Sequence, residues 1–579
     1  MSSFAGSAAL PSISGERSGS SRFLTVRLIH FAANFADKHG WLLFGVISLS
    51  CGWGAINVMV ARNLNHDELF TFYIAQAPTL HQLLKTSHTV DLQPPLSYLL
   101  VRLSFAMFGI SAWSCRLPFL VAYFVSSAIV FYFLRRLVSA TYGLIGALLL
   151  WSNPLVYLAR EARPYSILLC FTTLTLVSWY LAVASDDSDR RAKVLALVMA
   201  SGFGLLLSHV FGMLVYAAFL VAEVLRFAIR RKADWPLWAI LAVPLCCVIS
   251  YLPLLHNHST ILFAKEYRVT PLLLLSFYWE SIRFLITPLA FIAFLVVLGP
   301  VWRSELQAAT PLISRATSVS FQFLLTVMSL MPLAIGIVLG HMGTAFFNRY
   351  GVVWLLPLAI VPALLLGYRT GRNRIAGFVA VLALAVVLFF NSAGKAWLVD
   401  QISGLVPPAA AAKLLYVLSP PPIIPVHYPP TPSYLEAEIA TAPFITHLDS
   451  VAPELPVLAN TGLTFIEVDH QETAQVAQRL YMLTDDDAAS TIAHDTVFAH
   501  YQEVKEAFPM IRGRVEPYQA FIAAHPRFVV VGAYNNPQGW LLRKLDRDGA
   551  KLRVIGRCAG YSEDCQIYEV SVRSDSSER

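Results

Sequence analysis

Long apolar runs recur along this chain, and they restrict its fold more than any other feature. A helix needs roughly 20 apolar residues to cross a bilayer, and eleven runs approach that length. They lie near residues 40–60, 117–134, 141–158, 164–183, 194–208, 211–229, 236–253, 284–302, 318–339, 352–367 and 375–391. Because 56% of the 579 residues are hydrophobic and only 14% are charged, the composition excludes an ordinary soluble protein. We predict a polytopic α-helical membrane protein with about 11 transmembrane helices.

The basic residues indicate how these helices are oriented. The stretch 94–109 is apolar but short, carries Arg102 and begins with two prolines. If it crossed the membrane, the basic clusters at 135–136, 190–193 and 230–232 would all lie outside. As a helix in the membrane interface it leaves them all cytoplasmic, as the positive-inside rule expects. The outer loop 61–116 then faces the extracytoplasmic side.

The two ends of the chain differ from the apolar region, which we assign to a transmembrane domain over 39–392. Residues 1–38 lack the apolar core and cleavage site of a signal peptide, so we expect a cytoplasmic tail and an uncleaved first anchor. The net charge of +7 is spread over short loops, which indicates membrane orientation and no nucleic-acid partner. A Pro-rich linker over 393–435 precedes a more charged segment, 436–579.

This C-terminal segment is predicted to be a small extracytoplasmic α/β domain. The stretches "LPVLA" and "RFVVVGAY" are typical of buried strands, and "QETAQVAQRLYML" is typical of an amphipathic helix. Cys558 and Cys565 lie close together in "CAGYSEDC". Because the topology places them in an oxidising compartment, we expect a local disulfide, with two unpaired exposed thiols as the alternative.

Two adjacent carboxylates, Asp67 and Glu68, follow the first apolar run in "NHDELF". Asn65 could cap a helix here, with Glu68 three residues later completing a capping box. A carboxylate held at a helix N-terminus beside the bilayer can equally serve as a general base or a cation ligand. The sequence leaves both interpretations open.

Further polar residues lie on the same predicted outer face, at the ends of apolar runs or in the loops between them. They are His88, Asp91, Arg160, Glu161, Arg163, Tyr165, His209, Lys265, Arg349 and Tyr350. Arginines suit a phosphate group because the guanidinium fork makes bidentate contacts with it. Taken singly, each charge also fits a neutralised surface pair or a side chain that reaches toward lipid headgroups.

Several short motifs occur in a fixed order along the chain. The acidic pair is followed by "DLQPPL" (91–96), "GISAWSCRLP" (109–118), "EARPYS" (161–166), a histidine between two runs, and "RY" before a late run. In this order the chain resembles the GT-C membrane glycosyltransferases. The likeness is greatest to the bacterial polyprenyl-phosphate-sugar-dependent branch related to protein O-mannosyltransferases and the lipid A aminoarabinose transferase. It covers about residues 40–390 and leaves the tail out.

The resemblance implies an inverting transfer of one sugar from a polyprenyl-phosphate carrier to a lipid, glycan or protein acceptor. The implied location is the bacterial cytoplasmic (inner) membrane, with the active site and the C-terminal domain facing the periplasm or exterior. Asp67 matches the family's catalytic aspartate, and Glu68 lies beside it. Gln93 and Ser97 depart from the family pattern, where His and Tyr are frequent, which puts donor and acceptor selectivity in question.

Roles for the other outer-face residues follow from this resemblance. The donor phosphate is expected at Arg163, Arg349, Arg160 and Lys265. The rest of the substrate is expected at Asp91, His88, Glu161, Tyr165, His209 and Tyr350. We expect that the reaction requires no cofactor, and the sequence leaves open whether a divalent cation takes part. The alternative function is a transporter or flippase, which would need ionisable residues deep within the spans.

Overall fold

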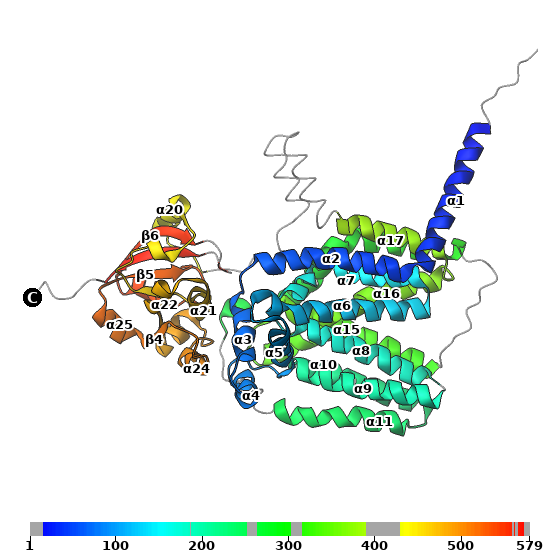
Figure 1. The fold of residues 1–579 in the computed structure, drawn as a ribbon, viewed down its shortest axis with the longest axis horizontal. Coiled ribbons are helices and arrows are strands. Elements are labelled where there is room, and N and C mark those ends of the chain that lie inside the picture. The colour runs from blue at the N-terminus through cyan, green and yellow to red at the C-terminus, as the bar shows by residue number, and fades with distance from the viewer. Residues whose placement is uncertain are drawn as a thin grey trace, which may run out of the picture.

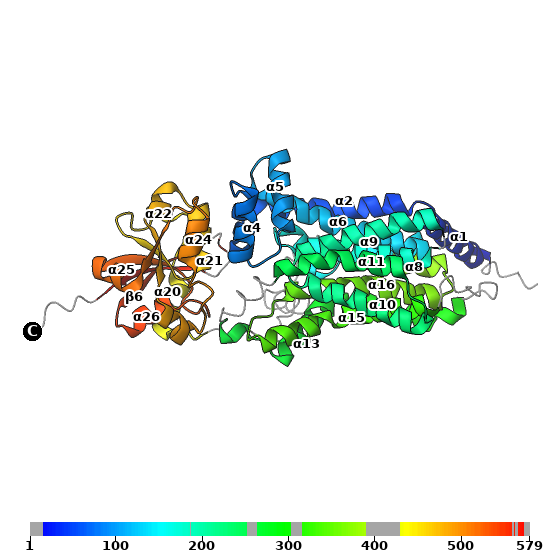
Figure 2. The same ribbon diagram turned by 90° about the horizontal axis from the view of Figure 1, so that it is seen from below.

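The protein has a helical bundle and a separate α/β domain, which lies beyond one end of the bundle in both views (Figures 1 and 2). The computed structural model describes residues 16–185, 187–251, 263–302, 315–389, 429–558, 561 and 565–572. The predicted linker 393–435 is outside the described residues up to 428. A multi-pass helical membrane protein with a C-terminal α/β domain, as predicted, is confirmed.

The bundle consists of apolar helices of different lengths. Its helices are α1 (Glu16–Lys38), α2 (Gly40–Ala61), α6 (Ala112–Leu137), α7 (Ala140–Trp151), α8 (Tyr165–Ala184), α9 (Ser188–Ser208), α10 (Gly212–Arg230), α11 (Trp235–Ala242), α13 (Pro271–Ile282), α14 (Ile286–Val297), α15 (Arg315–His341), α16 (Leu355–Arg369) and α17 (Arg374–Phe389). Among the described residues, seven helical segments are long and apolar enough to cross a membrane, or up to nine if each bent pair is one span. Other predicted runs form shorter apolar helices, such as Arg374–Val386.

One break in the bundle matters for the site. The run predicted as a span over 141–158 bends by 79° between α7 and a 3₁₀ helix, η1 (Pro154–Arg160). Pro154 cannot donate a backbone hydrogen bond, and the side chain of Asn153 caps the new helix by accepting from the N–H of Leu155 at 2.9 Å. The bend carries residues 160–163 sideways toward the end of the bundle where α3 begins.

Three short helices cover that end of the bundle: α3 (His66–Ala75), α4 (Leu80–Thr89) and α5 (Leu96–Phe108). We call it the loop-one end. At 1.5 Å per residue, the 13 residues of α5 reach only about 20 Å, less than a bilayer core of about 30 Å. Helices α6 and α10 run away from the loop-one end and end in basic residues. At that opposite end Arg191, in the first turn of α9, and Arg226 of α10 both bind Asp234.

The α/β domain is built on one seven-stranded sheet in the order β1-β6-β7-β5-β2-β3-β4. Its strands are β1 (Phe444–Ile445), β2 (Val457–Ala459), β3 (Leu480–Thr484), β4 (Arg514–Pro517), β5 (Arg527–Gly532), β6 (Lys551–Cys558) and β7 (Gln566–Ser571). Strands β5, β2, β3 and β4 are parallel, whereas β7 is antiparallel to both β5 and β6.

Helices flank this sheet, among them α20 (Ser433–Thr441), α21 (Gly462–Gln471), α22 (Ala474–Gln478), α24 (Tyr501–Ala507), α25 (Tyr518–Ala524) and α26 (Leu541–Arg547). The strands expected in "LPVLA" and "RFVVVGAY" are β2 and β5. The single helix expected in "QETAQVAQRLYML" is wrong: Gln471 ends α21, the five residues of α22 form a separate short helix, and β3 follows. Both faces of β3 are covered: Leu480 and Met482 pack into one apolar core, and Tyr481 and Leu483 pack into another. A short apolar run buried on both sides cannot be distinguished from a helix segment by its pattern alone.

An apolar core connects the two parts of the molecule. It joins Leu69 and Phe72 of α3 with Phe465 and Ile466 of α21, and it extends to Phe508 just after α24. The α/β domain is therefore packed on the loop-one end.

Candidate functional site

The first outer helix begins with a complete capping box. Asn65 Oδ1 accepts from the N–H of Glu68 at 2.9 Å, and Glu68 Oε2 accepts from the N–H of Asn65 at 3.1 Å. Both acids thus stand in the first turn of α3, where the helix dipole favours negative charge. Because one acid closes the cap, the adjacent Asp67 is left to point elsewhere.

Glu68 is fully buried and paired with a fully buried arginine. Arg116 donates from Nε to Oε1 and from Nη2 to Oε2, each at 2.7 Å, and it also binds the carbonyl oxygens of Met59, Arg62 and Asn63. The N–H of Ala162 donates to Glu68 as well, at 2.9 Å. Glu68 was predicted to be catalytic together with Asp67. Its contacts hold α2, α3, α6 and the 160–163 turn together. Arg116 lies in the "GISAWSCRLP" motif, but its charge was not assigned a role from sequence.

Asp67 faces two arginines that are distant in sequence. Its Oδ2 forms an ion pair with Arg349 Nη1, and its backbone carbonyl accepts from Arg163 Nη1 at 3.1 Å. The side chain is 17% exposed. Burial alone would raise the pKa of Asp67, but Arg349, Arg163 and His66 hold it well below its ordinary value. Asp67 is therefore ionised in this structure.

The second arginine connects Asp67 to another carboxylate. Arg163 Nη1 donates to Asp91 Oδ2 at 2.8 Å, and the Tyr98 hydroxyl donates to the same oxygen at 2.7 Å. Burial raises the pKa of Asp91 despite the opposing effect of Arg163 and Tyr98. Tyr98 was not predicted, although it lies two residues after the "PPL" motif. Within the described residues, Nε of Arg163 and Nε of Arg349 are both buried with no hydrogen-bond partner.

Aromatic rings and a histidine surround the arginines. The His209 ring lies 5.1 Å from that of Tyr165 and 6.4 Å from that of Tyr350, measured between centroids. Its Nδ1 accepts from the N–H of Phe211 at 3.1 Å, and its Nε2 is buried without a partner among the described residues. Burial, together with Arg163 and Arg349, lowers the pKa of His209 to about 3. The imidazole is therefore neutral.

Other predicted site residues lie at the rim or away from Asp67. Glu161 Oε1 lies 3.5 Å from Arg62 Nη1. Arg160 ends η1, and burial followed by the charge of Arg62 lowers its pKa. His88 is in the last turn of α4, and no hydrogen bond joins it to Asp67 or to the arginines in the part of the chain that the structure describes. Lys265 opens a 3₁₀ turn, but its side chain lies outside the described residues.

The acidic and histidine side chains of the described ranges are the candidates for metal ligation. Within the described ranges, no three or more His, Cys, Asp or Glu side chains are grouped so that they could hold a metal ion. The charges around Asp67 are instead balanced by guanidinium groups.

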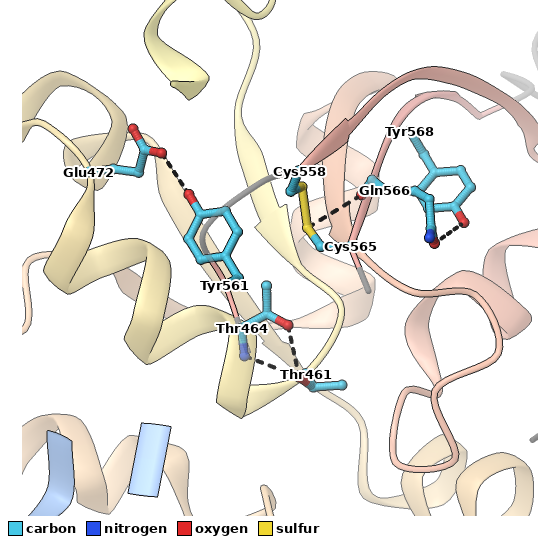
Figure 3. Close-up of a disulfide and its surroundings, with 8 residues drawn as sticks. All are labelled: Thr461, Thr464, Glu472, Cys558, Tyr561, Cys565, Gln566 and Tyr568. Atoms are coloured by element: carbon cyan, nitrogen blue, oxygen red, sulfur yellow. Dashed lines mark hydrogen bonds between the residues drawn. A yellow bond between two sulfur atoms is a disulfide. The ribbon is translucent and has the colours of Figure 1, made fainter. Parts of the chain in front are cut away.

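In the α/β domain, Cys558 and Cys565 are joined by a disulfide whose Cα atoms are 5.0 Å apart (Figure 3). It connects the end of β6 to the residue before β7.

Comparison with known protein families finds a match for one segment of the chain. Residues 92–253 match the family described as dolichyl-phosphate-mannose-protein mannosyltransferase. This segment holds Arg116, Arg163, Tyr165 and His209. The resemblance to polyprenyl-phosphate-dependent membrane glycosyltransferases is therefore confirmed. No curated protein sequence matches the chain significantly.

Two crystal structures of ArnT from Cupriavidus metallidurans are similar to this chain. The one bound to undecaprenyl phosphate is 12% identical, with a TM-score of 0.49, and the match covers 93% of this chain and 100% of that chain. The apo structure is 14% identical, with a TM-score of 0.42, and the match covers 92% and 98%.

Proposed function

We propose that this chain, whose residues 92–253 match a mannosyltransferase family, is an inverting glycosyltransferase of the cytoplasmic membrane. It moves one sugar from a polyprenyl-phosphate carrier to a hydroxyl group of a lipid, glycan or protein on the outer face. The observation that carries the proposal is Asp67 held against Arg349 and Arg163 at the loop-one end. A base and two phosphate-binding cations are the groups that this reaction needs.

The donor is amphipathic, so its isoprenoid tail belongs among the bundle helices and its phosphate at their ends. The unpartnered Nε groups of Arg163 and Arg349 are available to a phosphate oxygen there. Charge on the phosphate grows as the sugar leaves, so guanidinium contacts stabilise the transition state more than the ground state. Because Nδ1 of neutral His209 accepts from Phe211, its Nε2 carries the proton and can donate a hydrogen bond, and the uncharged ring does not repel the arginines.

Binding of the donor would also change Asp67. A phosphate that takes contacts from Arg349 weakens the Arg349–Asp67 pair, and the pKa of Asp67 then rises from its lowered value. The carboxylate becomes a stronger base only when the donor is present. It takes the proton of the acceptor hydroxyl while that oxygen bonds to the anomeric carbon, and the bond from the anomeric carbon to the phosphate oxygen breaks with its electron pair on the phosphate.

Arginines can neutralise the leaving phosphate, so we propose that the reaction requires no divalent cation. Purified protein should retain its rate of transfer in excess EDTA, and added Mg²⁺ or Mn²⁺ should not raise it. A rate that falls in EDTA and returns with one of these ions would contradict this.

The proposed function is tested by mass spectrometry of envelope lipids, glycans and proteins from cells with and without the gene. The expected result is one class of molecule that loses the mass of a single sugar when the gene is absent. Purified protein in nanodiscs should then consume a polyprenyl-phosphate-linked sugar and release polyprenyl phosphate. Identical profiles in the two strains, together with no donor consumption, would refute the proposal.

A further inference from the structure

The α/β domain contacts the helix that carries Asp67 directly. The N–H of His66 donates to Glu467 Oε1 at 2.8 Å, and Asn63 Nδ2 donates to Gln471 Oε1 at 3.0 Å. The Tyr73 hydroxyl lies 3.1 Å from His470 Nδ1. These three partners are all on α21, so one helix of the domain lies along the acidic loop.

A second contact shows which edge of the sheet faces the bundle. Asp495 Oδ2 accepts from the N–H of Ala264 at 3.0 Å and from Gln538 Nε2 at 3.1 Å. Asp495 follows β3 and Gln538 follows β5, just as α21 follows β2. The contacts therefore come from segments that leave the carboxyl ends of the parallel strands. In open sheets of this kind, ligands bind outside the carboxyl ends.

One tyrosine at this junction has an unused hydroxyl. Tyr501 begins α24 and is 3% exposed, yet its hydroxyl has no hydrogen-bond partner among the described residues. Buried tyrosine hydroxyls normally find a partner. The ring packs 6.2 Å from Phe465 and 5.5 Å from Phe498, between centroids. Gly462 makes room for it, because a Cβ there would lie 2.4 Å from Tyr501 Cζ.

The charges of two carboxylates affect the pKa of this hydroxyl. Burial raises the pKa of Tyr501, and the negative charges of Asp67 and of Glu467 raise it further. Asp67 comes from the bundle and Glu467 from α21, so the hydroxyl lies within the electrostatic reach of both parts of the protein. It stays protonated and can donate a hydrogen bond.

We infer that the α/β domain completes the active site, with Tyr501 donating a hydrogen bond to a hydroxyl-bearing acceptor beside Asp67. This inference rests on the proposed function. In an inverting displacement the acceptor approaches the anomeric carbon from the side opposite the leaving phosphate. The arginines that suit the phosphate belong to the bundle, which leaves the side of the α/β domain for the acceptor.

The test is Tyr501→Phe, which removes only the unpartnered hydroxyl. Full-length protein in nanodiscs is given a polyprenyl-phosphate-linked sugar and, as acceptor, the envelope fraction of cells that lack the gene, which holds unmodified acceptor. We expect the acceptor KM to rise about 2- to 10-fold, as for loss of one uncharged hydrogen bond, with the donor KM unchanged. The melting temperature should equal or exceed that of wild type, because no hydrogen bond within the protein is lost.

A matched control is Tyr568→Phe. Tyr568 is equally buried in the same domain, but its hydroxyl donates to Gln566 within β7 at 3.2 Å (Figure 3). This variant should keep both KM values. A Tyr501→Phe enzyme with a wild-type acceptor KM, or with a raised donor KM instead, would overturn the inference while the transfer itself stands. A wild-type protein that consumes no donor would instead remove the proposed function.

Discussion

At the scale of single residues, the site is a carboxylate whose properties are set by its arginines. Asp67 is paired with Arg349 and held by Arg163 through its backbone, which keeps it ionised but makes it a weak base. The proposed role of Arg349 thus has two parts: it restrains Asp67 in the free enzyme and binds phosphate in the complex.

Replacing Asp67 by Asn should remove the base and keep the shape of the site. We expect turnover to fall about 100- to 10,000-fold, the usual contribution of a general base. Donor binding should persist or tighten, because Arg349 is freed from its carboxylate. Turnover by purified variant and donor affinity measured separately check this, and wild-type turnover in Asp67→Asn would disprove the assignment.

Arg163→Ala and Arg349→Ala should each weaken the donor contact. A charge-assisted hydrogen bond is worth about 1.5–3 kcal/mol, so the donor KM should rise about 10- to 100-fold, and kcat should fall if the contact strengthens in the transition state. Lysine at either position should recover only part of the loss because the guanidinium fork is absent. If both alanine variants show the wild-type donor KM and kcat, these arginines do not bind phosphate.

The lowered pKa of Asp67 also predicts a dependence of stability on pH. A carboxyl group with a folded pKa below its unfolded value of about 3.9 stabilises the fold above that pH and loses this contribution as pH falls through the folded pKa. The difference in melting temperature between wild type and Asp67→Asn should therefore shrink as pH falls below about 4. A difference that stays constant from pH 5 down to pH 3 would contradict the lowered pKa, whereas a change between pH 6 and 8 would report titration of the neighbouring His66.

At the scale of helices and strands, the buried Glu68–Arg116 pair joins α3 to α6 and to the turn after η1. Neither side chain is exposed, and the second cation on Glu68, Arg62, is 42% exposed, so Arg116 supplies the buried charge that compensates this carboxylate. Sequence patterns placed both residues in motifs, but the pairing needed the fold, because they are 48 positions apart.

Arg116→Met should lower the free energy of unfolding by about 3–5 kcal/mol, since it leaves the buried Glu68 carboxylate with only the partly exposed Arg62 as an ion-pair partner. The double variant with Glu68→Gln should recover part of this loss. The control is Arg527→Ala, which breaks an ion pair with Glu569 whose arginine is 62% exposed, and which should cost at most about 1 kcal/mol. Thermal unfolding in detergent compares Arg116→Met, the double variant and Arg527→Ala. An equal loss of stability for Arg116→Met and Arg527→Ala would show that the buried pair does not stabilise the fold more than an exposed pair does.

At the scale of the whole molecule, the α/β domain and the loop-one end act as one unit, because α21 shares an apolar core with α3 and makes three polar contacts with α3 and the residues just before it. The predicted topology puts this unit outside the cytoplasm and the basic ends of α9 and α10 inside. Orientation follows from charge, which is readable in the sequence, whereas docking depends on surfaces that form only after folding.

Thiol labelling of intact cells tests this orientation. Glu436→Cys and Lys232→Cys introduce cysteines at exposed positions, in a background where the exposed Cys246 is Ala. A membrane-impermeant reagent should label Cys at position 436 in intact cells, and at position 232 only after the membrane is opened. The reverse pattern would invert the topology and place the site on the cytoplasmic face.

The sequence by itself determined the features that depend on neighbouring residues or on composition. These features are local patterns: the apolar runs, the capping box at Asn65, the strands β2 and β5 and the ordered motifs. Each can be read from neighbouring residues and does not depend on how the chain packs in three dimensions. Tertiary structure alone decided that Glu68 pairs with Arg116, that Asp67 pairs with Arg349 from 282 positions away, and that Glu467 of the C-terminal domain binds the backbone of His66 beside Asp67. These contacts join segments whose separation along the chain carries no periodic signal, and packing of the bundle and the α/β domain is what brings their charges together.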